Sequence, residues 1–242
     1  MKIVMQKMLI ILAFLSTTLL CFGQKEHLEF SKARDSTDRR GEHIKKYSDK
    51  FNALLYNDFS QKPYARYTCR PSFTASYAFS VEKIEGESYI ILNKFSTSYT
   101  AIVNYWIAKF NGGEDTVKIE TNKIKINDNL YLKIGELFDL LAEQTKEKEE
   151  EKERKFKVGA DGEVFEIISI ARLDGTTYFF TSTDKNGEKR TGTTWSPHPR
   201  YNPMLARLVK ICDDLCSKEI KNSIAQTNIL REIDILINGL KY

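Results

Sequence analysis

Residues that bind metals are scarce in this chain of 242 residues. Its three histidines, His27, His43 and His198, are far apart, and no two have the spacing of a zinc site. The sequence also lacks a C-x-x-C pair and an EF-hand loop. Residues 184–187 (DKNG) supply oxygen ligands without the terminal glutamate of such a loop, so they predict a tight turn. We therefore expect no metal ion and no other cofactor.

Catalytic motifs are missing as well. The chain has no G-x-S-x-G motif of serine hydrolases and no glycine-rich loop that would hold a phosphate before a helix. A thiol nucleophile would have to pair Cys69 with His198, but no characteristic sequence surrounds Cys69. A glycosidase-type pair of carboxylates leaves no mark in a sequence, because any two acidic side chains can meet in space. The pattern favours a protein without catalysis and leaves enzyme activity open.

Cysteine is also rare. Of four cysteines, three follow the N-terminal apolar segment: Cys69, Cys212 and Cys216. Because three is an odd number, one thiol must stay free or pair outside the chain. Cys212 and Cys216 lie one turn apart on a predicted helix, where a disulfide between them would be strained. We therefore predict a disulfide from Cys69 to one of these two. The alternative is that all three are small buried apolar residues.

Long apolar runs are absent except near the N-terminus. Residues 8–20 (MLIILAFLSTTLL) carry no charge and follow the basic residues Lys2 and Lys7. Residues 21–23 (CFG) then place small residues at the two positions that signal peptidase recognises. We predict that residues 1–23 are a signal peptide and that the mature protein is exported to the periplasm or secreted.

Two other interpretations of the N-terminal segment fit less well. Its apolar run falls short of the roughly 20 residues that a helix needs to span a bilayer, which argues against an uncleaved anchor. Lipidation at Cys21 requires a small residue just before the cysteine, and this chain has Leu20 there. No second run of spanning length follows, so we expect no membrane span after cleavage.

An excess of charge of one sign is absent too. The chain has 37 basic and 33 acidic residues, a formal net charge of +4, and loss of the signal peptide would remove two lysines. This balance gives little support to nucleic-acid binding. Residues 143–157 hold mainly Glu and Lys, with pairs such as Glu150 and Arg154 at helical spacing. They predict a solvated helical extension or linker, and a partner-docking arm is the alternative.

The first β block is predicted over about residues 71–127. Residues 71–95 alternate apolar and polar side chains around a turn at Glu85 and Gly86, which is the pattern of a hairpin. Residues 99–110 are apolar on both faces and predict a central strand, although a buried helix would give the same pattern. Residues 111–113 (NGG) favour another hairpin turn, with 116–120 as the partner strand.

The second β block, about residues 163–193, is predicted as a three-stranded meander with turn sequences between its strands. Asn127 or Asp128 is a candidate N-cap for one helix, and Asn202 before Pro203 for another. Helical spacing of apolar residues predicts helices at about 43–59, 128–155, 203–218 and 220–238.

These elements predict an α+β fold: an antiparallel sheet built from the two blocks, with helices packed on one side. Whether the blocks form one sheet or two stays open. A flexible lead-in over residues 24–41 precedes a single domain over residues 42–242, with a soft boundary in the charged segment.

Two clusters of aromatic and cationic residues are candidate binding residues, because Tyr, Trp and Arg are frequent at binding hot spots. A disulfide from Cys69 to the C-terminal part would bring the clusters together as one surface for a protein, a glycan or an anionic ligand. The alternative is that the aromatic residues pack in the core and the arginines are solvated. The first cluster is Tyr64, Arg66, Tyr67 and Arg70, with Phe73 close by, and the second is Trp195, His198, Arg200 and Tyr201.

These features favour an exported, non-catalytic protein that binds another envelope or extracellular protein, as an inhibitor, a protective partner or a surface-assembly component does. The alternative is a hydrolase that acts on envelope or extracellular polymers through carboxylates.

Overall fold

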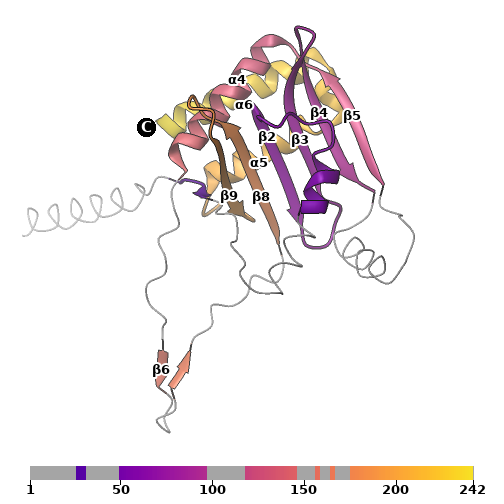
Figure 1. The fold of residues 1–242 in the computed structure, drawn as a ribbon. Coiled ribbons are helices and arrows are strands. Elements are labelled where there is room, and N and C mark those ends of the chain that lie inside the picture. Colours follow the sequence, from indigo (N-terminus) through magenta and orange to yellow (C-terminus); the bar gives the residue numbers. More distant parts are fainter. Residues whose placement is uncertain are drawn as a thin grey trace, which may run out of the picture.

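The computed structural model describes residues 26–30, 49–96, 118–145, 156–158, 164–166 and 175–241. They form the predicted α+β fold, in which one antiparallel sheet has the strand order β1-β9-β8-β2-β3-β4-β5 (Figure 1). Its strands are β1 (Glu29–Phe30), β2 (Ala65–Pro71), β3 (Tyr77–Ile84), β4 (Glu87–Phe95), β5 (Ile119–Lys125), β8 (Thr176–Thr183) and β9 (Lys189–Trp195). A separate two-stranded sheet pairs β6 (Phe156–Val158) with β7 (Val164–Glu166).

Strand β2 makes the two predicted blocks parts of one sheet. It pairs with β3 on one side and with β8 on the other, so that Cys69 lies between Tyr77 and Tyr178. The first β block was predicted to begin at about residue 71, and β2 lies before that boundary. The side chains of β2 do alternate, because Ala65, Tyr67 and Cys69 share one face. The other face carries Arg66 and Arg70, which are covered by other side chains although arginine is usually exposed.

The predicted hairpin turn is confirmed, and its first strand is shorter than expected. Glu85 and Gly86 form the turn between β3 and β4 with φ values of 52° and 84°. The left-handed φ at Gly86 costs little because glycine has no Cβ. The strand begins at Tyr77, and Phe73 lies in the preceding loop with 67% exposure. Residues 99–110 lie outside the described residues, and β4 pairs directly with β5.

The second block differs from the predicted meander. Its strands β8 and β9 form the predicted hairpin, which joins the main sheet through β2 and so answers the question of one sheet or two. In the described part of the chain, β7 pairs with β6 and not with this hairpin. The lead-in also contains structure: β1 pairs with β9 through Glu29 with Thr193 and Phe30 with Gly192.

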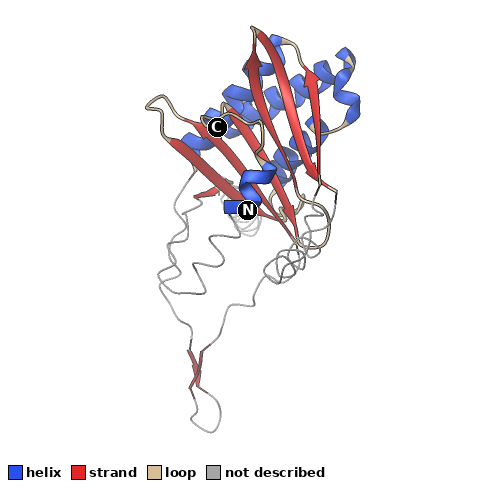
Figure 2. Ribbon diagram, turned by 45° about the vertical axis from the view of Figure 1, so that its right-hand side comes forward, coloured by secondary structure: helices blue, strands red, loops and turns tan. Residues whose placement is uncertain are grey.

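Three helices cover one face of the sheet: α4 (Asp128–Gln144), α5 (Pro203–Leu215) and α6 (Ser223–Lys241) (Figures 1 and 2). The 3-10 helix η1 (Lys218–Lys221) connects the last two. Residues 49–55 form a short helix on the opposite face, as Figure 2 shows. No helix among the described residues is long and apolar enough to cross a membrane.

The starts of α4 and α5 are capped in different ways. Asn127 caps α4 as predicted, since its side-chain oxygen accepts the amide of Leu130 at 2.8 Å. Asn202 was predicted to cap α5, but its side chain makes no such bond. The carboxylate of Glu26 accepts the amides of Met204 and Leu205 instead, at 3.3 and 3.0 Å. A long-range contact therefore replaces the local cap and ties the N-terminal segment to α5.

Two hydrophobic cores lie on opposite faces of the sheet. The larger core fills the space between the sheet and α4, α5 and α6 and includes Leu28 from the N-terminal segment. Gly192 makes room for Leu28, because a Cβ at Gly192 would lie 2.7 Å from the Leu28 Cβ. The smaller core lies beneath the short helix and consists of Phe51, Leu55, Phe59, Ala78, Ile91 and Phe95.

We predict that Gly135→Ala destabilises the protein by about 1–3 kcal/mol, because a Cβ there would lie 1.9 Å from the Tyr64 hydroxyl oxygen. Gly239→Ala is the matched control, since its nearest contact is the flexible end of Met204 at 3.1 Å. Alanine also favours helix over glycine by about 1 kcal/mol, so Gly239→Ala should be neutral or stabilising. Urea unfolding measures both. In a Tyr64→Ala background the cost of Gly135→Ala should disappear, and a persisting cost would contradict the clash.

Candidate functional site

The sheet divides the first predicted cluster. Successive side chains of β2 point to opposite faces. Tyr67 has 0% exposure in the larger core, whereas Arg66 and Arg70 lie on the face of the short helix. These residues therefore do not form the single exposed surface that the sequence suggested.

Both arginines of β2 are covered by aromatic rings. Arg66 has 6% exposure, lies 4.6 Å from the ring centroid of Tyr56 and donates to the Ser60 carbonyl oxygen. Arg70 lies between the rings of Phe51 and Phe179, at 4.8 and 5.0 Å, and donates to the side chain of Asn52. Cation–π contacts of this kind stabilise the packing of the short helix on the sheet. Their role is structural. The alternative of solvated arginines does not hold for the buried Arg66, whereas Arg70 is half-buried and Arg200 of the second cluster is exposed.

Tyr64 serves packing as well. Its half-buried ring stacks on Tyr131 of α4 with centroids 4.4 Å apart, and its hydroxyl lies against Gly135. Burial raises the Tyr64 pKa to about 12, and nearby Tyr131 and Asp139 add to the rise. Of the first cluster, neither Tyr64 nor Tyr67 offers an exposed ring to a partner.

A carboxylate, Asp213 of α5, is the polar centre of the larger core. The hydroxyls of Tyr67 and Tyr77 both donate to its Oδ1, at 2.8 and 2.7 Å. Burial raises the Asp213 pKa, and the two phenol donors oppose this rise only in part. Burial raises the pKa values of both phenols as well, so they act as donors at every ordinary pH. The cluster joins β2 and β3 to α5.

The three cysteines are free thiols, so the predicted disulfide from Cys69 is not present in this structure. The Cys69 thiol lies beside the hydroxyls of Tyr77 and Tyr67, and burial raises its pKa to about 12. Cys212 is fully buried and Cys216 is half-buried. Cys69 and Cys212 match the alternative interpretation of small buried residues, and Cys216 departs from it because it is only half-buried.

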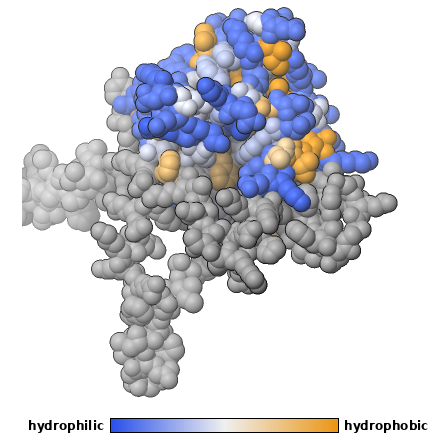
Figure 3. Space-filling view, in the orientation of Figure 1, coloured by the Kyte–Doolittle hydropathy of each residue, from blue (hydrophilic) through white to orange (hydrophobic). Residues whose placement is uncertain are grey.

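The second cluster lies at the surface at one end of the sheet, and Phe73 lies at the same end. Phe73 is 67% exposed, Trp195 36% and Tyr201 72%, and His198 and Arg200 are also exposed. We call these five residues the aromatic end. The described residues include seven exposed large apolar side chains, and three of them belong to this set. Most of the described surface in Figure 3 is hydrophilic, so such side chains are a minority on it.

Hydrogen bonds hold the aromatic end in place. The amide and hydroxyl of Ser72, beside Phe73, both donate to the Gly175 carbonyl oxygen, at 2.9 and 2.8 Å. Trp195 packs on Gly175 so closely that a Cβ there would lie 2.5 Å from the indole ring. Ser196 bonds to the backbone of Thr176 through its amide and its hydroxyl. The loop before β3 and the end of β9 are therefore fixed to each other.

The loop that leads into α5 is ordered by His198. Its carbonyl oxygen accepts the amides of Tyr201 and Asn202, at 3.0 and 2.8 Å, and its Nδ1 accepts the amide of Arg200 at 3.1 Å. The Tyr201 ring lies 5.3 Å from the imidazole and 5.8 Å from the Arg200 guanidinium. Exposed aromatic and cationic groups are thus presented on a rigid loop, which lowers the entropy cost of binding.

Only Arg70 of the first cluster comes near the second. Arg70 and Trp195 are both register partners of Thr177, on either side of β8. Directly paired residues point to the same face, so Arg70 and Trp195 share one face of the sheet. One residue of each cluster therefore shares a face of the sheet, with β8 between them.

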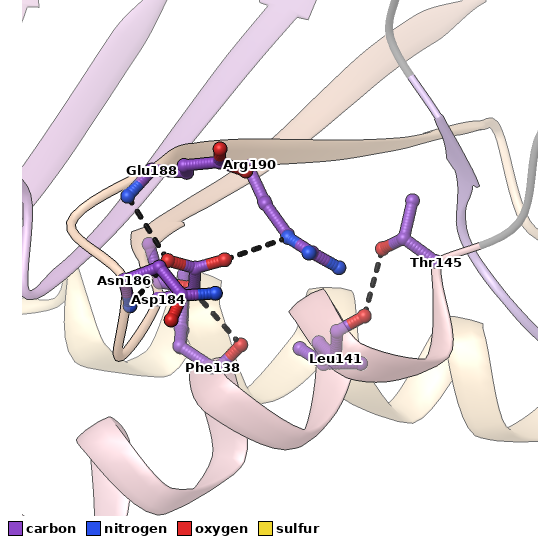
Figure 4. Close-up of polar contacts among 8 residues, drawn as sticks. Phe138, Leu141, Thr145, Asp184, Asn186, Glu188 and Arg190 are labelled. Carbon is purple, nitrogen blue, oxygen red and sulfur yellow. Dashed lines mark hydrogen bonds and ion pairs between the residues drawn. The ribbon is translucent and has the colours of Figure 1, made fainter.

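A cleft of about 250 Å³ lies at the opposite end of the same hairpin, where the β8–β9 turn meets α4. We call it the hairpin cleft. Figure 4 shows this region, with Asp184 bound to the turn and Arg190 extending over α4. The lining residues are Asp139, Ala142 and Glu143 of α4 and Asp184, Lys185, Asn186 and Arg190 of the hairpin.

Sequence reasoning identified the turn at residues 184–187 but neither the cleft nor the Asp213 cluster. Both require α4 or α5 to pack against particular strands, which no local pattern reports. Among the described residues, no group of three or more His, Cys, Asp or Glu side chains could hold a metal ion.

Comparison with known proteins gives no relative: no family model, no curated protein and no solved structure matches the chain. Function must therefore be argued from the geometry alone.

We predict a pH effect on stability from Asp213. Its folded-state pKa lies above the ordinary value of 3.8, so the carboxylate is disfavoured in the folded state. The stability it contributes is complete below pH 3.8 and is lost as pH rises through the folded-state pKa. Asp213→Asn should abolish this step in a plot of unfolding free energy against pH. An unchanged step in the variant would assign it to another group.

We also predict that Cys69 and Cys212 resist alkylation in the folded protein at neutral pH, because burial keeps both as thiols. Cys216, the least buried, should react first. In urea without reductant all three should react, as peptide mapping by mass spectrometry would show. A cysteine that reacts in urea only after reduction would reveal a disulfide.

Proposed function

We propose that this chain is an exported, non-catalytic binding protein that recognises a protein partner through the aromatic end. The observation that carries the proposal is the exposure of Phe73, Trp195 and Tyr201 on hydrogen-bonded loops at one end of the sheet. Rigid aromatic side chains bury a large area on binding at low entropy cost.

The charges at the aromatic end favour an acidic partner surface. Arg200 and His198 accompany the exposed rings, and the half-buried Arg70 lies on the same face as Trp195. An Arg guanidinium beside Tyr can form a bidentate pair of hydrogen bonds with a carboxylate and can stack on an aromatic ring of the partner. A partner segment with acidic and aromatic residues would satisfy both requirements.

The hydrolase alternative has less support. Two of the three carboxylates that line the hairpin cleft have pKa values shifted in opposite directions: burial raises the pKa of Asp139, and the turn amides lower the pKa of Asp184. Such a pair would suit acid–base catalysis. However, Asp184 Oδ1 accepts the amides of Asn186 and Glu188, and its Oδ2 accepts from Arg190. Asp184 is therefore committed to the turn and has no free oxygen to activate a substrate.

Export rests on the basic and apolar N-terminal sequence, with cleavage before Gln24. The partner is then a protein of the envelope or the extracellular space. The first described residue, Glu26, follows that cleavage position closely and already contacts α5.

We predict that Phe73→Ala, Trp195→Ala and Tyr201→Ala together weaken partner binding by more than about tenfold, as loss of hot-spot side chains does. The matched control replaces Leu132, Ile224 and Ile235, three exposed apolar residues elsewhere, with alanine. The measurement is crosslinking capture from the envelope and extracellular fractions, followed by affinity measurement with the captured protein.

Both triple variants should keep the wild-type circular dichroism spectrum. Because Trp195 packs on Gly175, an Arg200→Ala and Tyr201→Ala double variant provides a second test without that contact. Equal capture by the variants of the aromatic end and by the control would refute the proposed surface. Polymer hydrolysis that is lost in Asp139→Asn would support the alternative function.

A further inference from the structure

The hairpin cleft has two walls of opposite charge. Asp139 and Glu143 lie one turn apart on α4 and form the acidic wall. The hairpin supplies Lys185, Arg190 and the carboxylate of Asp184 that pairs with Arg190, so its wall, which we call the basic wall, keeps an excess of one positive charge. Within the described part of the chain, no ion pair joins one wall to the other. The two charges are therefore held apart across an open space.

The basic wall is fixed by the turn. Asp184 accepts the amides of Asn186 and Glu188, each at 2.9 Å, and thereby orders the backbone of the turn. Its other oxygen accepts the Arg190 Nε at 3.0 Å. The guanidinium is thus positioned through Nε. Its two Nη groups donate to no group of the described residues. In Figure 4 they point away from Asp184, toward the side of Leu141 and Thr145.

Among the described residues, no cation forms an ion pair with Asp139 or Glu143. Burial raises the pKa of Asp139, and repulsion from Glu143 adds to the rise, while Lys185 opposes it. A cation placed between Asp139 and Glu143 would relieve this repulsion and favour the ionised form. Ala142, between them in sequence, is an apolar residue of the lining.

We propose that the hairpin cleft binds a small zwitterion of the α-amino acid class. The ligand carboxylate is held by the Arg190 Nη groups and Lys185, and the ligand ammonium by Asp139 and Glu143. A volume of about 250 Å³ lies just below the roughly 300–1,000 Å³ of sites for larger organic ligands, which fits a ligand of this size. The proposal is independent of the partner surface, because the aromatic end lies at the opposite end of the hairpin.

The test is a titration of the full exported protein with glycine. Binding is measured by isothermal titration calorimetry and by the NMR chemical shifts of the backbone amides. We expect saturable binding, with shifts concentrated in the last turns of α4 and in residues 184–190. Acetate and methylammonium carry one charge each and should bind at least about tenfold more weakly at equal ionic strength, because each makes half of the charged hydrogen bonds.

Substitutions in each wall test whether that wall binds the ligand. Asp139→Asn with Glu143→Gln, and separately Lys185→Gln, should each raise the glycine dissociation constant at least about tenfold. The matched controls are Glu120→Gln on β5 and Lys189→Gln at the start of β9, which do not line the cleft. Their affinity should equal that of the wild type. Arg190 is left intact because it also supports the turn.

Three outcomes would overturn the proposal. The first is an absence of saturable binding by glycine and by a panel of larger amino acids. The second is methylammonium binding as tightly as glycine, which would make the cleft a simple cation site. The third is equal binding by the wall variants and the controls.

Discussion

Tyr67 at the centre of β2 is the contact on which the rest of this fold depends. Its ring lies 5.5 Å from Phe79 of β3 and 5.4 Å from Phe180 of β8, between ring centroids, and its hydroxyl donates to Asp213 of α5. One side chain therefore joins both halves of the sheet to the helical layer. Loss of a buried aromatic residue of this kind costs about 3–5 kcal/mol, a large share of the stability of a typical domain.

Burial of the central sheet on both faces determines where a partner can bind. The helices cover one face, and the short helix with the rings around Arg66 and Arg70 covers part of the other. The β8–β9 hairpin is held by β2 on one side and by β1 on the other. It therefore presents its two ends on a fixed scaffold: the aromatic end near Trp195 and the hairpin cleft near Asp184. A rigid support lowers the entropy cost of binding at either end of the hairpin.

The carboxylates near these features have separate roles. Asp213 joins the core to the sheet through two phenols, and Asp184 orders a turn and positions Arg190. Asp139 stays available to a ligand at the rim of the cleft. Catalysis by a carboxylate pair requires two acids that reach one substrate. Asp213 and Asp184 are thus committed to holding the framework, and both Asp139 and Glu143 line the cleft.

Local patterns in the sequence determined the elements whose signals are local: the turn at Glu85 and Gly86, the Asn127 cap, the turn at residues 184–187 and the C-terminal helices. Side-chain alternation also indicated an antiparallel sheet, but the expectation that all helices pack on one side was wrong, because the helix of residues 49–55 covers the opposite face. Only the tertiary structure decided that β2 is the central strand, that Arg66 and Tyr67 face opposite cores, and that Glu26 caps α5. The reason is physical: a strand's neighbours, and hence what each face touches, are set by contacts between residues far apart in the chain. The same long-range packing leaves Trp195 and Tyr201 exposed, half-buries Tyr64 and buries Tyr67. The sequence alone does not distinguish these four aromatic residues.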